Sequence, residues 1–189
     1  WSEIDSDFLG LVIESVTDPE DVSGLNNNYT SAANVIKVIG PLFLNDLYEE
    51  LELAQENLNS LKNLHKKVIS LRVFDPSCGA GNFLIVSLIE LKTLENEIRK
   101  KLLSFSFDFD SLKTPSVSQF YGIESNHFKV QVSILGLCFM YFQGNDKSNI
   151  SIDSISRIYN STKILVGNPT RIEWRSFCKS DSQYPVYIV

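Results

Sequence analysis

The stretch VFDPSCGAGNFL, residues 73–84, decides the fold of this chain. Its apolar start ends in an acidic residue, a Gly-x-Gly turn follows, and an amphipathic helix begins at once. In open α/β sheets this order brings backbone N–H groups and a carboxylate to the carboxyl edge of the first strand, where nucleotide-like ligands bind. The stretch therefore predicts a strand, a turn and a helix with a ligand site at the turn.

The residues of the turn narrow the class of ligand. Gly79 and Gly81 can adopt positive φ and approach a ligand closely, while Pro76 cannot extend the strand. Asp75 adds a negative charge, which disfavours a triphosphate and suits a ligand with an ammonium group. The sequence lacks both the Gly-Lys-Ser/Thr ending of a P-loop and the third glycine of a dinucleotide fingerprint. An ordinary strand-to-helix turn remains the alternative.

The string DPSCGAGNFL, residues 75–84, resembles the S-adenosyl-L-methionine-binding motif of the amino-methylating DNA methyltransferases, D-P-[AS]-C-G-[ACST]-G-x-F/L. In that family the glycine turn wraps the methionine end of the cofactor, and the acidic residue lies close to its ammonium group. The resemblance implies that cofactor-binding residues are Asp75, Pro76, Ser77, Gly79, Ala80, Gly81, Asn82 and Phe83.

A second apolar stretch, FYGIESN at residues 120–126, also ends in an acidic residue. A carboxylate at this strand end can accept hydrogen bonds from both ribose hydroxyls of a nucleoside, so Glu124 is the predicted ribose ligand, with Ser125 beside it. Glu124 lies 49 positions after Asp75, against about 20 in the dinucleotide fingerprint, and a long helix and loop account for the difference. A solvated glutamate at a strand end is the alternative.

Two further strings extend the resemblance. LNNNYTSAANVIKVIGPLFL, residues 25–44, is similar to the family's amino-terminal cofactor motif, which implies cofactor contacts for Tyr29 and Thr30. Thr30 or Ser31 can cap the following helix, whose free N–H groups would then face a cofactor carboxylate. GNPTRIEW, residues 167–174, is similar to the family segment beside the cofactor's adenine, which implies adenine contacts for Asn168 and Pro169. A plain helix cap and a plain turn remain the respective alternatives.

Composition and charge set broader limits. The 189 residues suffice for one domain, or one with an appendage, and the 43% hydrophobic content excludes general disorder. We expect a soluble, cytoplasmic protein, because the sequence shows neither a membrane-length apolar run nor a signal peptide. The three separated cysteines fit a reducing compartment and predict no metal site. Neither His65 nor His127 has metal or nucleophile spacing, and we expect surface or helix-end positions for both.

The net charge of −6 is unfavourable for a chain that grips duplex DNA by itself. Its basic residues are scattered, and we interpret the short clusters at 66–67 and 99–101 as solvated helix faces. If duplex DNA is the partner, most of its contacts are therefore expected outside this chain.

Alternating strands and helices predict a parallel, doubly wound α/β sheet behind an N-terminal helical cap, and the resemblance implies a Rossmann-like class I methyltransferase fold. We expect a helical segment at 1–70 and an α/β domain at 71–189. The expected helices are 2–16, 31–40, 41–64, 82–103 and 126–142; the strands are 71–75, 119–124, 150–153, 163–167 and 186–189; the loops are 18–28 and 104–118.

The resemblance as a whole is to the methylase region of single-chain type II restriction-modification enzymes that methylate N6 of adenine. The last residues, 185–189, look like the start of the strand that carries the family's catalytic Asn-Pro-Pro-Tyr/Phe motif, so no catalytic residue is assigned within the chain. The choice of base and the oligomeric state stay open. A non-catalytic assembly module, and an RNA or small-molecule methyltransferase, are the alternative functions.

Overall fold

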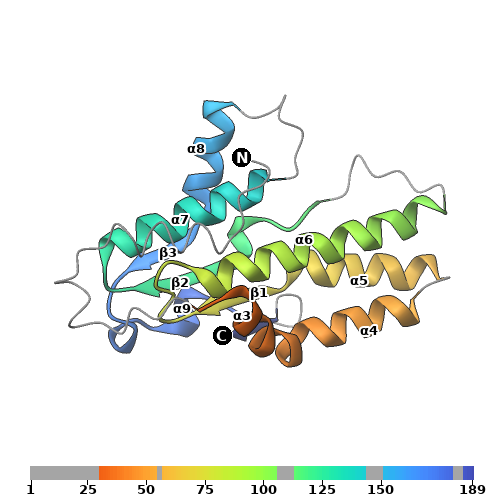
Figure 1. The fold of residues 1–189 in the computed structure, drawn as a ribbon, viewed down its shortest axis with the longest axis horizontal. Coiled ribbons are helices and arrows are strands. Elements are labelled where there is room, and N and C mark those ends of the chain that lie inside the picture. The colour runs from red at the N-terminus through yellow and green to blue at the C-terminus, as the bar shows by residue number, and fades with distance from the viewer. Residues whose placement is uncertain (1–29, 55–56, 106–112, 144–150, 181–184) are drawn as a thin grey trace.

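Four parallel strands form the centre of the fold in the computed structural model, which describes residues 30–54, 57–105, 113–143, 151–180 and 185–189 (Figure 1). The strands are β1 (Arg72–Asp75), β2 (Phe120–Glu124), β3 (Lys163–Val166) and β4 (Val186–Ile188), in the spatial order β3-β2-β1-β4. The chain thus builds outward from β1 to β3 and then returns to the opposite side of β1. This parallel sheet with its helices confirms the predicted Rossmann-like α/β fold.

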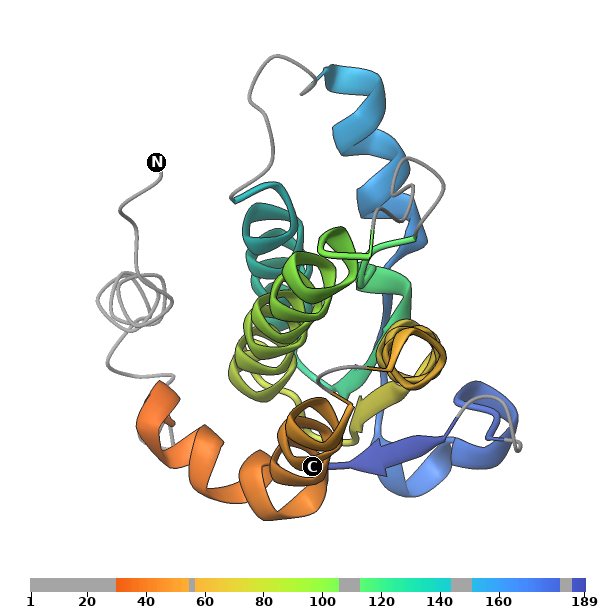
Figure 2. The ribbon, with the colours of Figure 1, turned by 90° about the vertical axis from the view of Figure 1, so that its right-hand side faces the viewer.

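Helices precede, connect and follow these strands. They are α3 (Ala32–Ile39), α4 (Asn45–Leu53), α5 (Leu58–Ser70), α6 (Asn82–Leu103), α7 (His127–Phe142), α8 (Ile152–Ser161) and α9 (Trp174–Phe177). A π-helical turn spans Gly40–Leu44, and 3-10 turns span Val117–Gln119 and Pro169–Arg171. Figure 2 shows α6 and α7 on one side of the strands and the short α9 on the other.

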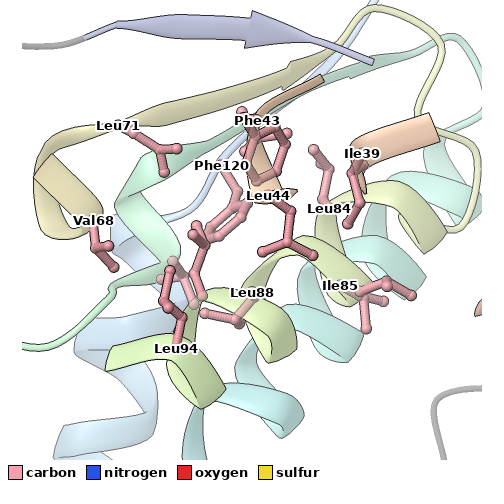
Figure 3. Packing of buried hydrophobic residues seen from close by; sticks show 14 of the residues in the cluster. Ile39, Phe43, Leu44, Val68, Leu71, Leu84, Ile85, Leu88, Leu94 and Phe120 are labelled. Atoms are coloured by element: carbon pink, nitrogen blue, oxygen red, sulfur yellow. The ribbon is translucent and has the colours of Figure 1, made fainter. Parts of the chain in front are cut away.

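The first face of the sheet packs into the main hydrophobic core. Val73 and Phe120 are paired neighbours in the sheet and are fully buried in this core. Figure 3 shows Phe120 among the core side chains of the helices. On the helix side, Leu84 and Leu88 of α6 are buried against them, together with Phe43 from the turn that follows α3. Helices α3 to α7 therefore share one core with the sheet, to which the N-terminal helices contribute buried side chains from Val35 to Val68.

The second face has a smaller cover. Because side chains alternate along a strand, Phe74 and Tyr121 point away from the main core, where they form a separate cluster with Cys178. Trp174 and Phe177 of α9 contact the Phe74 ring edge-on, with ring centroids 5.4 and 6.0 Å away.

Two predicted elements are wrong. The strand expected at 150–153 is replaced by α8, whose N-cap Ser151 exchanges capping hydrogen bonds with Ser154. The continuous helix expected at 41–64 is instead a π-helical turn at Pro41 followed by two helices, the second starting after Asn57. The Asn57 side chain accepts hydrogen bonds from two backbone N–H groups of α5, which favours a new helix start there. The helix expected at 2–16 and the loop at 18–28 lie outside the described residues.

His65 does not lie at the surface as expected. It is 3% exposed, and its Nε2 lies 3.4 Å from Oε1 of Glu95 on α6, which also accepts a 2.7 Å hydrogen bond from Arg99. The residues Leu61, Leu64 and Val68 place His65 on the buried stripe of α5, and this spacing would have revealed it. His127 does begin a helix, as expected, and is exposed.

Candidate functional site

The predicted site residues from the strand ends meet at the carboxyl edge of the sheet. Asp75 ends β1 and Glu124 ends the neighbouring β2, while β4 lies on the other side of β1. The backbone N–H of Val189 donates to the carbonyl of Phe74, which holds the end of β4 beside this edge. The edge between β1 and β4 is therefore the topological switch point, where open α/β sheets bind ligands.

The turn after β1 is tied to its neighbours by hydrogen bonds. Oδ1 of Asp75 accepts from the backbone N–H of Ser77 at 2.9 Å. The N–H of Cys78 donates to the carbonyl of Ile123 in β2 at 3.0 Å, and the N–H of Gly81 donates back to Cys78 at 2.7 Å. The turn thus has a defined shape before α6 begins at Asn82.

The two glycines of the turn adopt positive φ for different reasons. Gly81 has φ +90°, and a Cβ there would lie 2.3 Å from Oγ of Ser133 on α7, so the helix packs directly against the backbone. Gly79 has φ +53°, and a Cβ there would meet nothing within 4 Å. The turn is therefore closed toward α7 at one glycine and open at the other.

Glu124 is joined directly to this turn. Its Oε2 accepts a hydrogen bond from the N–H of Gly79 at 3.1 Å. Its Oε1 accepts from the N–H of Asn126 at 2.8 Å and from the hydroxyl of Ser125 at 3.1 Å. The structure thus brings the two strongest sequence candidates, the glycine turn and Glu124, into direct contact.

The carboxylates make this edge electronegative. Asp75 is 6% exposed, and burial raises its pKa to about 6; the Ser77 N–H partly offsets this shift, and the nearby Glu124 adds to it. Among the described residues, neither carboxylate forms an ion pair with a lysine or arginine. Burial also raises the pKa of the Cys78 thiol, as do the neighbouring carboxylates, so the thiol stays protonated. The arrangement suits a ligand that brings its own positive charge.

Asn168 and Pro169 reach the same edge from β3. The N–H of Gly167 donates to the carbonyl of Glu124 at 2.9 Å, which fixes the start of this segment beside β2. Oδ1 of Asn168 accepts from the N–H of Thr170 at 2.9 Å and from its hydroxyl at 2.7 Å. The carbonyl of Pro169 accepts from Nε1 of Trp174 at 2.7 Å.

The remaining candidates are less closely tied to the turn. Tyr29 lies outside the described residues, and Thr30 precedes α3. Ser31 takes the N-cap position of α3, but its hydroxyl makes no capping hydrogen bond. Around the turn itself, Ser77 is exposed, and the half-buried residues are Pro76, Ala80, Asn82 and Phe83.

Ser133 is not among the residues predicted from the sequence, yet it is fully buried in α7 and lies against Gly81. Ser133 and Gly136 are small residues three positions apart in a largely apolar part of the helix. A Cβ on Gly136 would lie 2.5 Å from Cδ1 of Ile85, so α7 approaches α6 closely along this side. That spacing of small residues is the signal that would have identified the contact.

Two kinds of feature are absent from the described residues. No helix there is long and apolar enough to span a membrane. No group of three or more histidine, cysteine, aspartate or glutamate side chains there is arranged to hold a metal ion, and Cys78, Cys138 and Cys178 are free and buried.

Comparisons with known proteins agree with this geometry. Residues 51–189 match the family model described as the MmeI DNA-methyltransferase domain. The whole chain is 33% identical to DNA methyltransferase A of Bacillus subtilis (strain 168), of which it covers 22%. The solved structure of the type IIL restriction-modification enzyme MmeI in complex with DNA is similar with a TM-score of 0.78 and 33% identity, over 94% of this chain and 24% of that one. The chain thus spans less than a quarter of the length of these relatives.

Proposed function

The chain belongs to the MmeI DNA-methyltransferase domain family, and from that premise we propose that it binds S-adenosyl-L-methionine within a DNA adenine-N6 methyltransferase of a restriction-modification system. The observation that carries the proposal is the open glycine turn hydrogen-bonded to Glu124 at the switch point of the sheet. Membership of a DNA-methyltransferase family also favours DNA over RNA or a small molecule as the substrate.

The residues present fit this cofactor. The buried Asp75 carboxylate has no basic partner among the described side chains and suits the ammonium of the methionine moiety. The open space at Gly79 allows a ligand close to the backbone, and the half-buried Glu124 can accept from ribose hydroxyls. When bound, the cofactor supplies a sulfonium methyl group for transfer. The contribution of this chain is to bind and orient that donor.

We assign contact with DNA and the methyl-transfer step mainly to regions of the protein beyond these 189 residues. The net charge of −6 is a poor match for a phosphate backbone. A base within a duplex must be flipped out to reach a methyl donor, which requires further protein surface. A DNA substrate also makes the cytoplasm the proposed site of action. The chain alone is expected to transfer no methyl group, and labelling of duplex DNA by it would refute this division of roles.

Calorimetric titration with S-adenosyl-L-methionine tests the cofactor assignment. We expect binding by the unaltered chain and at least about tenfold weaker binding by Asp75→Asn, which keeps Oδ1 for Ser77 but removes the charge. Asp153→Asn, at an exposed position of α8, is the matched control and should bind normally. Folded, unaltered protein that gives no binding signal would refute the proposal.

A further inference from the structure

Basic side chains that are separated in the sequence come together on one side of the sheet. Among residues 163–180, four are basic and one, Glu173, is acidic, although the whole chain has a net charge of −6. The basic residues, all of them exposed, are Lys163, Arg171, Arg175 and Lys179. None of the four forms an ion pair with a carboxylate of the described residues. This part of the chain therefore has an excess of positive charge at its surface.

The segment from 167 to 180 crosses the second face of the sheet. It leaves the carboxyl edge after β3, and Figure 2 shows its helix α9 on the side opposite α6 and α7. Over the middle of the face, the ring of Phe177 in α9 contacts that of Phe74 in β1. The segment then reaches the start of β1, where the carbonyl of Lys179 accepts a hydrogen bond from Arg72. It thus runs from the candidate site toward the opposite edge of the sheet.

The basic residues follow this path at regular intervals. Arg171, Arg175 and Lys179 are four residues apart; the first ends the 3-10 turn at the carboxyl edge, and the second lies on α9. Lys163 belongs to the same face, because it is paired in the sheet with Tyr121, whose ring contacts α9. These four residues on or near α9 are called the basic surface below.

Exposed cations gathered on one face favour a partner with repeated negative charges. A nucleic acid is such a partner, because Lys and Arg neutralise its phosphates and release counterions. Arg can also bind a phosphate through two parallel hydrogen bonds. An acidic protein segment is the other class of partner, but the position of Arg171 favours DNA. A base that reaches the methyl donor at the carboxyl edge stays joined to its flanking phosphates, so these must pass close to that edge.

We propose, on the basis of the proposed function, that the basic surface contacts the phosphate backbone of the duplex beside the flipped base. Arg171 is nearest to the candidate site, and Arg175, Lys179 and Lys163 contact phosphates farther from it. Such contacts carry no sequence information but fix the position of the duplex. The chain thus supplies its own share of the DNA contact, although most of that contact is assigned to other regions.

Fluorescence anisotropy with a fluorescein-labelled DNA duplex, measured over a series of low salt concentrations, tests this inference. We expect the unaltered chain to bind, with an affinity that falls as the salt concentration rises. The double variant Arg175→Gln/Lys179→Gln should bind at least about tenfold more weakly, and its slope of log affinity against log salt should be smaller by about 2. Both residues lie away from the glycine turn, so affinity for S-adenosyl-L-methionine should change less than about twofold.

The matched control is Lys66→Gln/Lys100→Gln, which removes two exposed positive charges from α5 and α6, the helices of the first face. Its affinity for DNA should change less than about twofold. Equal losses in the two double variants would overturn the inference, because net charge alone would then explain the binding. Folded, unaltered chain that does not bind DNA would overturn it too. Competition by poly-L-glutamate as effective as by unlabelled DNA would assign the surface to an acidic protein instead.

A second pair of substitutions, Lys163→Gln/Arg171→Gln, lies outside α9 and should give a similar loss of DNA affinity. It decides the question if the first pair prevents folding. The inference and the proposed function can also fail separately. A chain that binds S-adenosyl-L-methionine but not DNA contradicts the inference alone. A chain that binds DNA through the basic surface but does not bind S-adenosyl-L-methionine refutes the proposed function and supports the phosphate contacts.

Discussion

The two faces of the sheet differ in how they are covered. The first face buries Val73 and Phe120 beneath α6 and α7, with further helices packed around them. The second buries Phe74 beneath a four-residue helix and its flanks. Second-face positions further out are open, since Leu165 is 40% and Ile188 52% exposed. The packing on the first face therefore contributes most of the hydrophobic stabilisation, and the packing on the second face contributes less.

The candidate site lies where these two regions meet. Its glycine turn rests on α7, which belongs to the first face, through the contact of Gly81 with Ser133. The segment from Asn168 to Trp174 leads from the edge onto the second face. The glycine turn is thus supported by the well-packed first face, whereas the segment that begins at Asn168 belongs to the less covered second face.

Matched substitutions on the two faces test the comparison most strongly. Phe120→Ala should lower the free energy of unfolding by about 4 kcal/mol, because it leaves a cavity enclosed by helices. Phe74→Ala should lower it by about 1 kcal/mol less, since the short α9 can relax into the space. Urea unfolding followed by circular dichroism measures both. Equal losses would show that the two faces are equally rigid.

The glycine turn gives the next largest expected effect. Gly81→Ala should destabilise the chain by about 3 kcal/mol, because positive φ is strained for alanine and its Cβ would clash with Ser133. Gly79→Ala has the backbone strain without the clash and should lower stability by only about 1 kcal/mol. Thermal unfolding distinguishes the two. If Gly81→Ala is as mild as Gly79→Ala, α7 does not support the turn as described.

The smallest expected effect is the dependence of cofactor affinity on pH, through Asp75 at the carboxyl edge of the sheet. Because the pKa of Asp75 is about 6, the carboxylate is protonated at pH 5, and its attraction for an ammonium group is lost. Cofactor affinity should therefore rise about tenfold between pH 5 and pH 7 and then level off. Titrations across this range measure it, and Asp75→Asn should flatten the curve. Without ligand, pH acts on stability in the opposite direction. Because burial raises the pKa of Asp75 from 3.8 to about 6, the free energy of unfolding should fall as the pH rises between these two values.

Two of the wrong predictions, the strand at 150–153 and the surface position of His65, share one cause. The sequence predicts a short strand at 150–153, yet Ile152, Ile155 and Tyr159 follow a helical spacing behind the cap Ser151. The surface position expected for His65 depends on its lack of metal or nucleophile spacing, whereas its place between Leu64 and Val68 puts it in the core beside Glu95. In both cases the wider pattern decided the structure, and a short window did not contain it.

The sequence by itself determined the strand, turn and helix at 71–103, the acidic strand end at Glu124 and the family resemblance, because backbone preference and side-chain alternation act within a few residues. Only the tertiary structure decided that Glu124 bonds to Gly79, that Gly167 bonds to Glu124 and that Ser133 closes one side of the turn. These contacts join strands and helices far apart in the chain, so no local pattern specifies them.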